Sequence, residues 1–238
     1  MSGHSHWATT HRQKGLNDAK RAAIFTKVGR IVTIAAKGGG NPDMNFKLRL
    51  AIDTARSVNM PKDRIDRAIA AGTGEAKEGA LIEELLYEAY GPGQVAMLIG
   101  VATDNRNRSV GEIKTLLTKN GGKMVTSGAI SFLFEACGEV VIDSKGKIDE
   151  SLELALIESG ADNFERGDEN SICVYTKPEK LKEVEAALQT LGLPILSSSL
   201  SYLPSQKIEL SEADLDSYEK LRELLEDNAD VQRIWDNL

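Results

Sequence analysis

Histidine and cysteine are scarce in this 238-residue chain, and their scarcity excludes several kinds of site. The only histidines are His4, His6 and His11, so no histidine can serve as a general base beyond the N-terminal tail. The two cysteines, Cys137 and Cys173, lack the Cys-x-x-Cys spacing of a structural zinc site. The sequence therefore predicts a protein that is not an enzyme and that uses no metal or other cofactor.

Long apolar runs are also missing. The longest surrounds Ala96-Met97-Leu98-Ile99, far short of the roughly 20 residues that a membrane-spanning helix needs. The first six residues lack the apolar core of a signal peptide. An apolar fraction of 41% with 27% charged residues is ordinary for a globular protein in water. We therefore expect a cytoplasmic protein with no membrane partner.

Charge is divided unevenly along the chain. Residues 1–67 carry thirteen Lys or Arg against five Asp, a net charge of +8. Residues 68–238 carry 16 basic and 31 acidic residues, a net charge of −15. The overall charge of −7 thus hides a strongly basic segment. Such asymmetry predicts a polyanionic partner for the N-terminal third.

Hydrophobic periodicity predicts three helices in this basic third. The first begins at Asn17 or Asp18 and ends at the glycines 38–40, and the second follows Asn41-Pro42-Asp43. The third begins at Pro61, which suits a first helical turn, and ends at Gly72-Thr73-Gly74. We expect residues 1–78 to form a helical nucleic-acid-binding domain.

Beyond Ala80 the pattern changes to strands and helices, which predicts an α+β multidomain protein. Strands are expected at 85–90, 94–103, 129–135 and 139–142, and the polar loop Asp104–Arg108 is expected to lead into a helix that ends at Asn120-Gly121-Gly122. From 139 to 203 the order strand, helix, strand, strand, helix, strand is that of a ferredoxin-like unit. A strand at 207–210 and a helix from Ser211 through Leu225 follow. The predicted domains are a discontinuous middle α+β domain, 79–136 plus 205–238, and a ferredoxin-like α+β domain, 137–204.

The main candidate site is a basic arc on the first helix. Clustered Lys and Arg on one helical face are the electrostatic footprint of phosphate-backbone binding, although charge runs are often only solvated surface. Here the basic run extends over three helices with few acids, and an aromatic residue in the tail could stack on bases. The predicted nucleic-acid-binding residues are Trp7, Arg12, Lys14, Lys20, Arg21, Lys27, Arg30 and Lys37, together with Arg106 and Arg108.

Two other segments are weaker candidates. In Asp104–Arg108, two arginines at a strand-to-helix junction could clamp a phosphate or cap local carbonyls, but a loop held by Asx turns is at least as good an interpretation. Gly121-Gly122 and Gly128 bracket a segment that we expect to be flexible. Because it lacks a Walker pattern, it does not predict nucleotide binding.

Ordered motifs along essentially the whole chain resemble the YebC/PmpR family. They are Gly3-His4-Ser5-x-Trp7, Asp18-Ala-Lys-Arg21, Ile24-Phe-Thr-Lys27, Gly38-Gly-Gly-Asn-Pro42, Asn59-Met-Pro-Lys-Asp63, Tyr87-Glu-Ala-Tyr-Gly-Pro-Gly93, Thr103-Asp-Asn-Arg-Asn-Arg108 and Ser201-Tyr-Leu-Pro204. The resemblance implies three domains, of which the N-terminal helical one binds nucleic acid. This sequence departs from the family pattern at His6, where Lys is usual, and at Ala22-Ala23, where Gly-Lys is usual.

The resemblance implies two alternative functions. Bacterial relatives are regarded as DNA-binding transcriptional regulators, whereas the mitochondrial relative is a translational activator and some bacterial relatives resemble ribosome-associated factors. We therefore expect a DNA-binding regulator of transcription or, alternatively, a translation factor that binds ribosomal RNA on the ribosome. Phosphate contacts carry no sequence information, so the basic residues do not separate DNA from RNA. No oligomeric state follows from the sequence.

Overall fold

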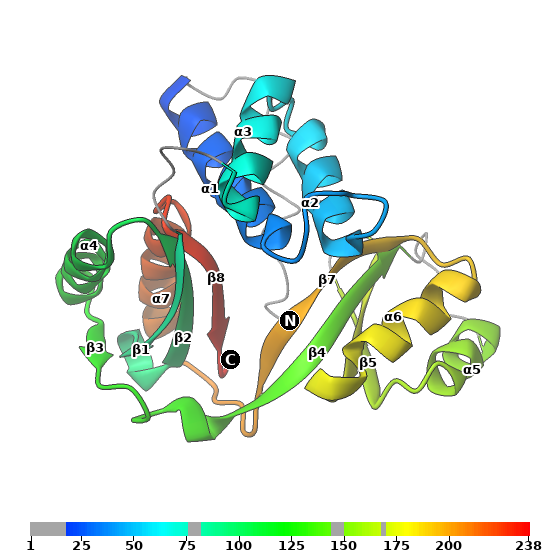
Figure 1. The fold of residues 1–238 in the computed structure, drawn as a ribbon. Helices are drawn as coiled ribbons and strands as arrows, with labels where there is room; N and C mark the ends of the chain where they lie inside the picture. Colours follow the sequence, from blue (N-terminus) through cyan, green and yellow to red (C-terminus); the bar gives the residue numbers. More distant parts are fainter. Residues whose placement is uncertain (1–17, 76–81, 144–149, 168–169) are drawn as a thin grey trace. The chain divides into compact units, whose positions relative to one another are not determined.

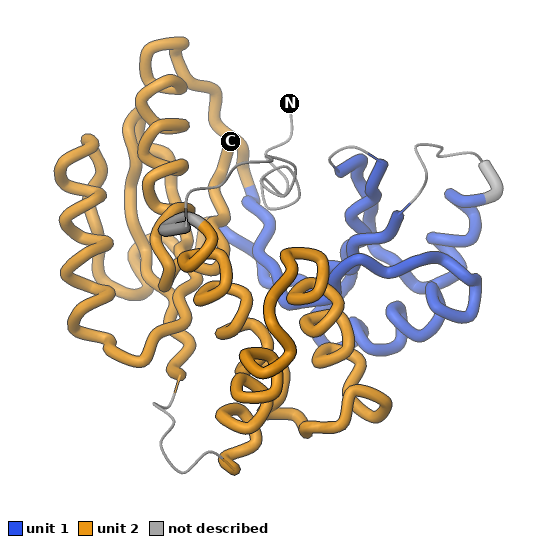
Figure 2. Tube along the Cα trace, turned by 90° about the horizontal axis from the view of Figure 1, so that it is seen from above, with its two compact units in different colours: residues 1–13, 134–205 blue, residues 14–133, 206–238 orange. Residues whose placement is uncertain are grey.

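The computed structural model describes residues 18–75, 82–143, 150–167 and 170–238, without the side chains of 18–20 and 150–151. The described residues form two compact units, coloured separately in Figure 2. One unit is Phe134–Ser205. The other combines residues up to Leu133 with Gln206–Leu238, so segments from both ends of the chain belong to it.

A bundle of three helices opens the chain, as predicted (Figure 1). The helices are α1 (Asp18–Ala36), α2 (Phe46–Ser57) and α3 (Lys62–Thr73). Asn45 connects the first two: its Oδ1 accepts from the Leu48 N–H at 3.1 Å, and its Nδ2 donates to the carbonyl of Ala35 at 2.7 Å. This N-cap satisfies a donor at the start of α2 and an acceptor at the end of α1.

The helices of the bundle pack closely because Gly72 has no side chain. A Cβ at this position would lie 2.2 Å from the carbonyl oxygen of Thr33 and 2.6 Å from the Cβ of Ala36. The glycines that end the third predicted helix therefore also let α3 approach α1. The bundle has its own core, formed by Val28, Val32, Ala36, Leu48, Ala51, Ile52, Ala55, Met60, Ile65 and Ala68.

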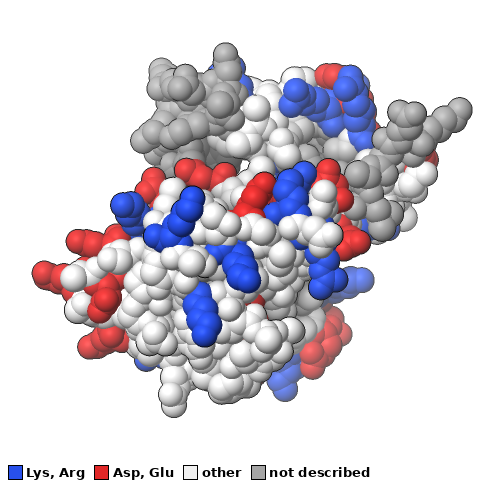
Figure 3. Space-filling model, turned by 90° about the vertical axis from the view of Figure 1, so that its left-hand side faces the viewer, with Lys and Arg blue, Asp and Glu red and all other residues white. Residues whose placement is uncertain are grey.

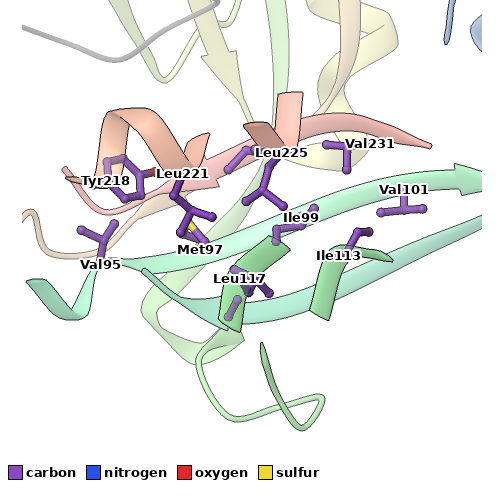
Figure 4. Close-up of a cluster of buried hydrophobic side chains, with 12 residues drawn as sticks. Val95, Met97, Ile99, Val101, Ile113, Leu117, Tyr218, Leu221, Leu225 and Val231 are labelled. Atoms are coloured by element: carbon purple, nitrogen blue, oxygen red, sulfur yellow. The ribbon is translucent and has the colours of Figure 1, made fainter. Parts of the chain in front are cut away.

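The first sheet combines strands from the middle and the end of the chain. Its strand order is β3-β1-β2-β8, and all neighbouring strands are antiparallel. The strands are β1 (Glu83–Tyr90), β2 (Ala96–Thr103), β3 (Lys123–Val125) and β8 (Val231–Asp236), and the helices α4 (Arg106–Lys119) and α7 (Glu212–Glu226) pack on the sheet. Figure 4 shows Met97 and Ile99 of β2 among side chains of both helices, including Leu117 and Leu221.

Two strands of this sheet, β3 and β8, were not predicted. The expected strand at 207–210 is not formed; Ile208 instead donates its N–H to the carbonyl of Asn237 at 2.7 Å. β8 is short, and its pairing with β2 places Ile234 opposite Ile99. Because these partners are far apart in sequence, no local pattern marks β8 as part of this sheet.

The second sheet has the predicted ferredoxin-like topology. Its strand order is β5-β6-β4-β7, and the strands alternate with helices in the β-α-β-β-α-β order. The elements are β4 (Phe134–Asp143), α5 (Glu150–Glu158), β5 (Asn163–Arg166), β6 (Ser171–Thr176), α6 (Leu181–Thr190) and β7 (Ile195–Pro204). Buried residues of β4, β6, α5 and α6 form its core, including Val140, Val174, Leu156 and Leu188.

One strand replaces the two that were predicted at 129–135 and 139–142. Residues Ser131–Leu133 form a short 3-10 helix, and β4 then runs without a break to Asp143, so the expected domain boundary between 136 and 137 lies inside a strand. Gly138 lies within this strand. In the structure it accommodates a helix, since a Cβ there would lie 2.9 Å from the Cβ of Leu181.

Within the described residues, no helix combines the length and apolar character needed to cross a membrane.

Candidate nucleic-acid interface

Arg30 of α1 is directed out of the bundle toward the segment that precedes β8. Its Nη1 lies 2.6 Å from Oδ1 of Asp230 and also donates to the carbonyl of Ala229. Its Nη2 lies 3.8 Å from Oδ1 of Asp104. The residue is only 9% exposed. In this arrangement the guanidinium is occupied by oxygen atoms of the protein.

Asp230 is the centre of a buried polar network. Its carboxylate accepts hydrogen bonds from Thr103 Oγ1 at 3.1 Å, from Arg108 Nη2 at 3.1 Å and from the hydroxyl of Ser109. Burial by itself would raise the pKa of Asp230, but the Ser109 and Arg108 hydrogen bonds and the charge of Arg30 outweigh it and lower the pKa. Asp230 is therefore ionised at neutral pH and joins α1, β2 and α4.

Two more cations, one in α1 and one directly after its last residue, contact the same region. Lys27 donates to the carbonyl of Glu226 at 3.3 Å, and burial lowers its pKa although Glu226 and Asp227 act in the opposite direction. Lys37 donates to the carbonyl of Ile82 at 3.1 Å and lies 3.3 Å from Oε1 of Glu84. We call Lys27, Arg30 and Lys37 the inner cations. They share one side of α1, as the helical wheel predicted, but that side contacts other parts of the protein.

The Asp104–Arg108 segment is held by local hydrogen bonds. Asn105 is the N-cap of α4, and its Oδ1 accepts from the Arg108 N–H at 3.1 Å. The Arg108 guanidinium lies 2.8 Å from Asp104 and 3.1 Å from Asp230. The loop is shorter than expected, because α4 begins at Arg106, and Asn105 caps this helix as the Asx-turn interpretation allows. Arg106 is exposed at the first position of α4.

The segment around Gly128 is tied to the first sheet. The buried carboxylate of Glu88 accepts hydrogen bonds from the backbone N–H groups of Gly128 at 2.6 Å, Ile130 at 2.7 Å and Ser131 at 3.1 Å. These donors hold the pKa of Glu88 below its usual value, against the effect of burial. We expected a flexible loop here, and this expectation was wrong. The sequence around Gly128 does not reveal the hydrogen bonds that hold the segment, because the acceptor, Glu88, lies 40 residues earlier in the chain.

A second group of cations faces solvent on α2 and α3. We call them the outer cations: Lys47, Arg49, Arg56, Lys62, Arg64 and Arg67, all exposed. Arg56 and Arg67 form exposed ion pairs with Asp53 and Asp63. Among the described residues no carboxylate pairs with Lys47, Lys62 or Arg64. Arg49 donates to the carbonyls of Pro42 at 3.2 Å and Asp43 at 3.1 Å. Since exposed ion pairs are weak, the other five are accessible to an anionic partner.

The other predicted site residues are distributed differently. Trp7, Arg12 and Lys14 lie outside the described residues, as does the side chain of Lys20. Arg21 is exposed on α1. Sequence reasoning missed the outer cations as a group: their charge contributes to the basic excess, but no helical stripe distinguishes them. On the face drawn in Figure 3, Lys and Arg side chains stand among acidic and uncharged ones.

The ranges that the structure describes contain no candidate metal site. There, no group of three or more His, Cys, Asp or Glu side chains could hold a metal ion.

Two family models together match nearly the whole chain. The model described as "TACO1/YebC protein N-terminal domain" matches residues 5–75, and the one described as "TACO1/YebC second and third domain" matches residues 82–238. The first match covers the bundle, and the second covers both sheets.

Similar proteins of known sequence and structure agree with these matches. A "probable transcriptional regulatory protein" of Chlorobaculum tepidum is 42% identical over 239 residues, which cover 100% of this chain and 95% of that protein. A protein of the same description from Syntrophus aciditrophicus is 45% identical over 240 residues, with the same coverage. A conserved hypothetical protein of Aquifex aeolicus, solved by crystallography, superposes with a TM-score of 0.83 at 38% identity, covering 98% of this chain and 96% of that one.

Proposed function

The chain belongs to the TACO1/YebC family, and from that premise we propose that it is a non-enzymatic, nucleic-acid-binding regulator of gene expression, most simply a DNA-binding transcriptional regulator. The names of its bacterial relatives support the regulatory part of this proposal. The observation that carries the nucleic-acid part is the set of exposed cations on α2 and α3.

The bundle is the part of the molecule suited to a phosphate backbone. Six exposed basic side chains occupy α2 and α3, against three Asp residues and no Glu on the same helices. The remainder of the chain is strongly acidic and would repel a polyanion. A nucleic acid would therefore approach the bundle and displace counterions from the outer cations.

The inner cations have a different part in this proposal. They already contact Asp230, Glu84 and backbone carbonyls, so their contribution to phosphate binding requires those contacts to break. We propose that the outer cations and Arg21 make the main phosphate contacts. Trp7, Arg12, Lys14, Lys20 and Arg106 remain predicted contributors.

A binding experiment on the full chain tests this function. The protein is titrated into labelled duplex DNA and single-stranded RNA at equal salt concentration, and its sedimentation with ribosomes is measured in the same buffer. DNA binding with a steep salt dependence supports the transcriptional form of the proposal. Strong ribosome association with weak DNA binding would instead support the translation-factor alternative.

Charge variants show whether the bundle is responsible. Replacing Lys47, Lys62 and Arg64 by Gln should weaken binding about tenfold or more, because each lost phosphate contact reduces affinity. The matched control replaces three exposed lysines outside the bundle by Gln: Lys114 and Lys119 of α4 and Lys123 of β3. Equal losses in the two triple variants, or no binding by the unmodified protein at low salt, would refute the proposal.

A further inference from the structure

A hollow of about 320 Å³ lies between α1 and α3, beside residues Ile82 and Asp104. Its volume is at the lower end of the range of about 300–1,000 Å³ that is usual for small-molecule sites. The hollow is open on one side, so one segment of an extended molecule could enter it while the rest stays in solvent. Two of its lining residues, Arg30 and Asp104, also belong to the network centred on the buried Asp230.

The charges around this hollow are mainly positive. Arg30, Arg64 and Arg67 line it, and among the described residues Asp104 is the only carboxylate that does so. Arg30 is occupied by Asp230, whereas Arg67 forms only an exposed pair with Asp63 at 3.0 Å. Arg64 has no ion pair with a described carboxylate. An anion in the hollow would thus meet two guanidinium groups that are free to turn toward it.

Phe25 positions one of these guanidinium groups. The Cζ atom of Arg64 lies over the Phe25 ring, 5.5 Å from its centroid. Stacking on the ring holds the guanidinium plane and leaves its N–H edge available, which is the edge that binds a phosphate with two parallel hydrogen bonds. Phe25 itself packs partly against the core of the bundle, so the arrangement rests on a fixed element.

α1 contributes a glycine to the lining of the hollow. Gly29 of α1 lines the hollow, and a Cβ built on it would have no heavy atom within 4 Å. A glycine costs stability inside a helix, and here no packing contact requires it. Its absence of a side chain keeps the hollow open next to Arg64 and Arg67.

From this geometry we infer that the hollow is a phosphate-binding subsite: one backbone phosphate of a nucleic acid strand enters between α1 and α3 and is held by Arg64 and Arg67. The inference rests on the proposed function and adds a particular place to it. It also assigns Gly29 a role, since any side chain at this position would occupy the site.

A glycine substitution tests the subsite with a matched control. Gly29→Glu places a carboxylate in the hollow, whereas Gly111→Glu adds the same side chain to α4, where a Cβ also has no heavy atom within 4 Å. Both changes remove a helical glycine, so both should leave folding intact or improve it. Affinity for a labelled oligonucleotide is measured for both, with circular dichroism and thermal unfolding as checks of the fold.

The expected results differ between the two variants. Gly29→Glu should bind about tenfold more weakly than Gly111→Glu, because a charge-assisted phosphate contact is lost. For Gly29→Glu, the slope of log K for oligonucleotide binding against log salt should be shallower than that of Gly111→Glu by about 0.7–0.9, which corresponds to the loss of one phosphate contact. Gly29→Gln, which fills the hollow without charge, should lie between Gly29→Glu and the unmodified protein.

Three results would overturn the inference. Equal affinities of Gly29→Glu and Gly111→Glu would show that no phosphate enters the hollow, while the proposed function would stand if the unmodified protein binds. Displacement of the oligonucleotide from the unmodified protein by inorganic phosphate at constant ionic strength would identify free phosphate as the occupant. Failure of the unmodified protein to bind any nucleic acid would refute both proposals.

Discussion

The inner and outer cations of the bundle carry the same charge but have different surroundings. Arg30 donates to the buried Asp230, and Lys27 donates to a carbonyl near the end of α7. Lys47 and Lys62 on α2 and α3 are exposed and pair with no carboxylate among the described residues. The basic excess of the N-terminal third is therefore divided between cations that contact the first sheet and the segments next to it and cations that face solvent.

This difference shows that positive charge in a sequence does not identify a ligand-binding surface. A basic side chain becomes structural when the fold supplies a buried acceptor, and removing that acceptor leaves a buried charge that is expensive. The inner contacts also differ among themselves, from the buried Arg30–Asp230 pair to the exposed Lys37–Glu84 pair. The predicted size of the effect of each substitution follows this order of burial.

The largest effect is expected from Asp230→Ala. This change leaves the guanidinium groups of Arg30 and Arg108 and the hydroxyl of Ser109 without their common acceptor, which should lower the free energy of unfolding by about 3–5 kcal/mol. Urea denaturation measures the loss. Asp216→Ala, on the exposed side of α7, is the control. If the two variants unfold at the same urea concentration, Asp230 does not hold the bundle in place.

A smaller and pH-dependent effect is expected from Lys27→Met. Because the pKa of Lys27 is lowered in the folded state, the folded protein loses this proton before the unfolded chain does, and stability rises with pH up to about 10.5. Met keeps the apolar stem without the buried charge, so the variant should be more stable by about 1 kcal/mol at neutral pH. This gain should disappear as the pH approaches 10.5. Denaturation at several pH values measures it, with the exposed Lys220→Met as control; a gain that is independent of pH would contradict the assignment.

The smallest effect is expected from Lys37→Gln. The side chains of Lys37 and Glu84 are 44% and 58% exposed, so solvent screens their interaction. The change should cost about 0.5 kcal/mol, and addition of salt should reduce the difference from the unmodified protein. Urea denaturation at low and high salt measures both. If Lys37→Gln lowered the free energy of unfolding as much as Asp230→Ala, the strength of these contacts would not depend on how exposed they are.

Local patterns predicted much of the fold. The apolar stripes and the glycines near residues 38 and 74 placed the three helices, and the order of elements after residue 139 predicted the ferredoxin-like topology. The failures lie where a partner is distant. β8 depends on pairing with β2, more than a hundred residues earlier. In place of the two strands predicted at 129–135 and 139–142 there is one, β4, whose Gly138 accommodates Leu181 of a helix that comes later in the chain.

The candidate site was less predictable than the fold for the same reason. A helical wheel places Lys27, Arg30 and Lys37 on one side of α1 but gives no information about what covers that side. Their partners include the Glu226 carbonyl and Asp230, about two hundred residues away. The exposure of the outer cations, in contrast, depends on no distant partner and follows once the apolar faces of α2 and α3 are buried.

The salt dependence of nucleic-acid binding tests the division between inner and outer cations most directly. We predict that changing Lys47, Lys62 and Arg64 to Gln will reduce the magnitude of the slope of log K against log salt by about 2–3, because up to three phosphate contacts are lost. The unfolding midpoint of this variant should not change. Changing Lys27 to Met and Lys37 to Gln should leave the slope as it is in the unmodified protein. A reduced slope in the inner variant, with an unchanged slope in the outer one, would contradict this account.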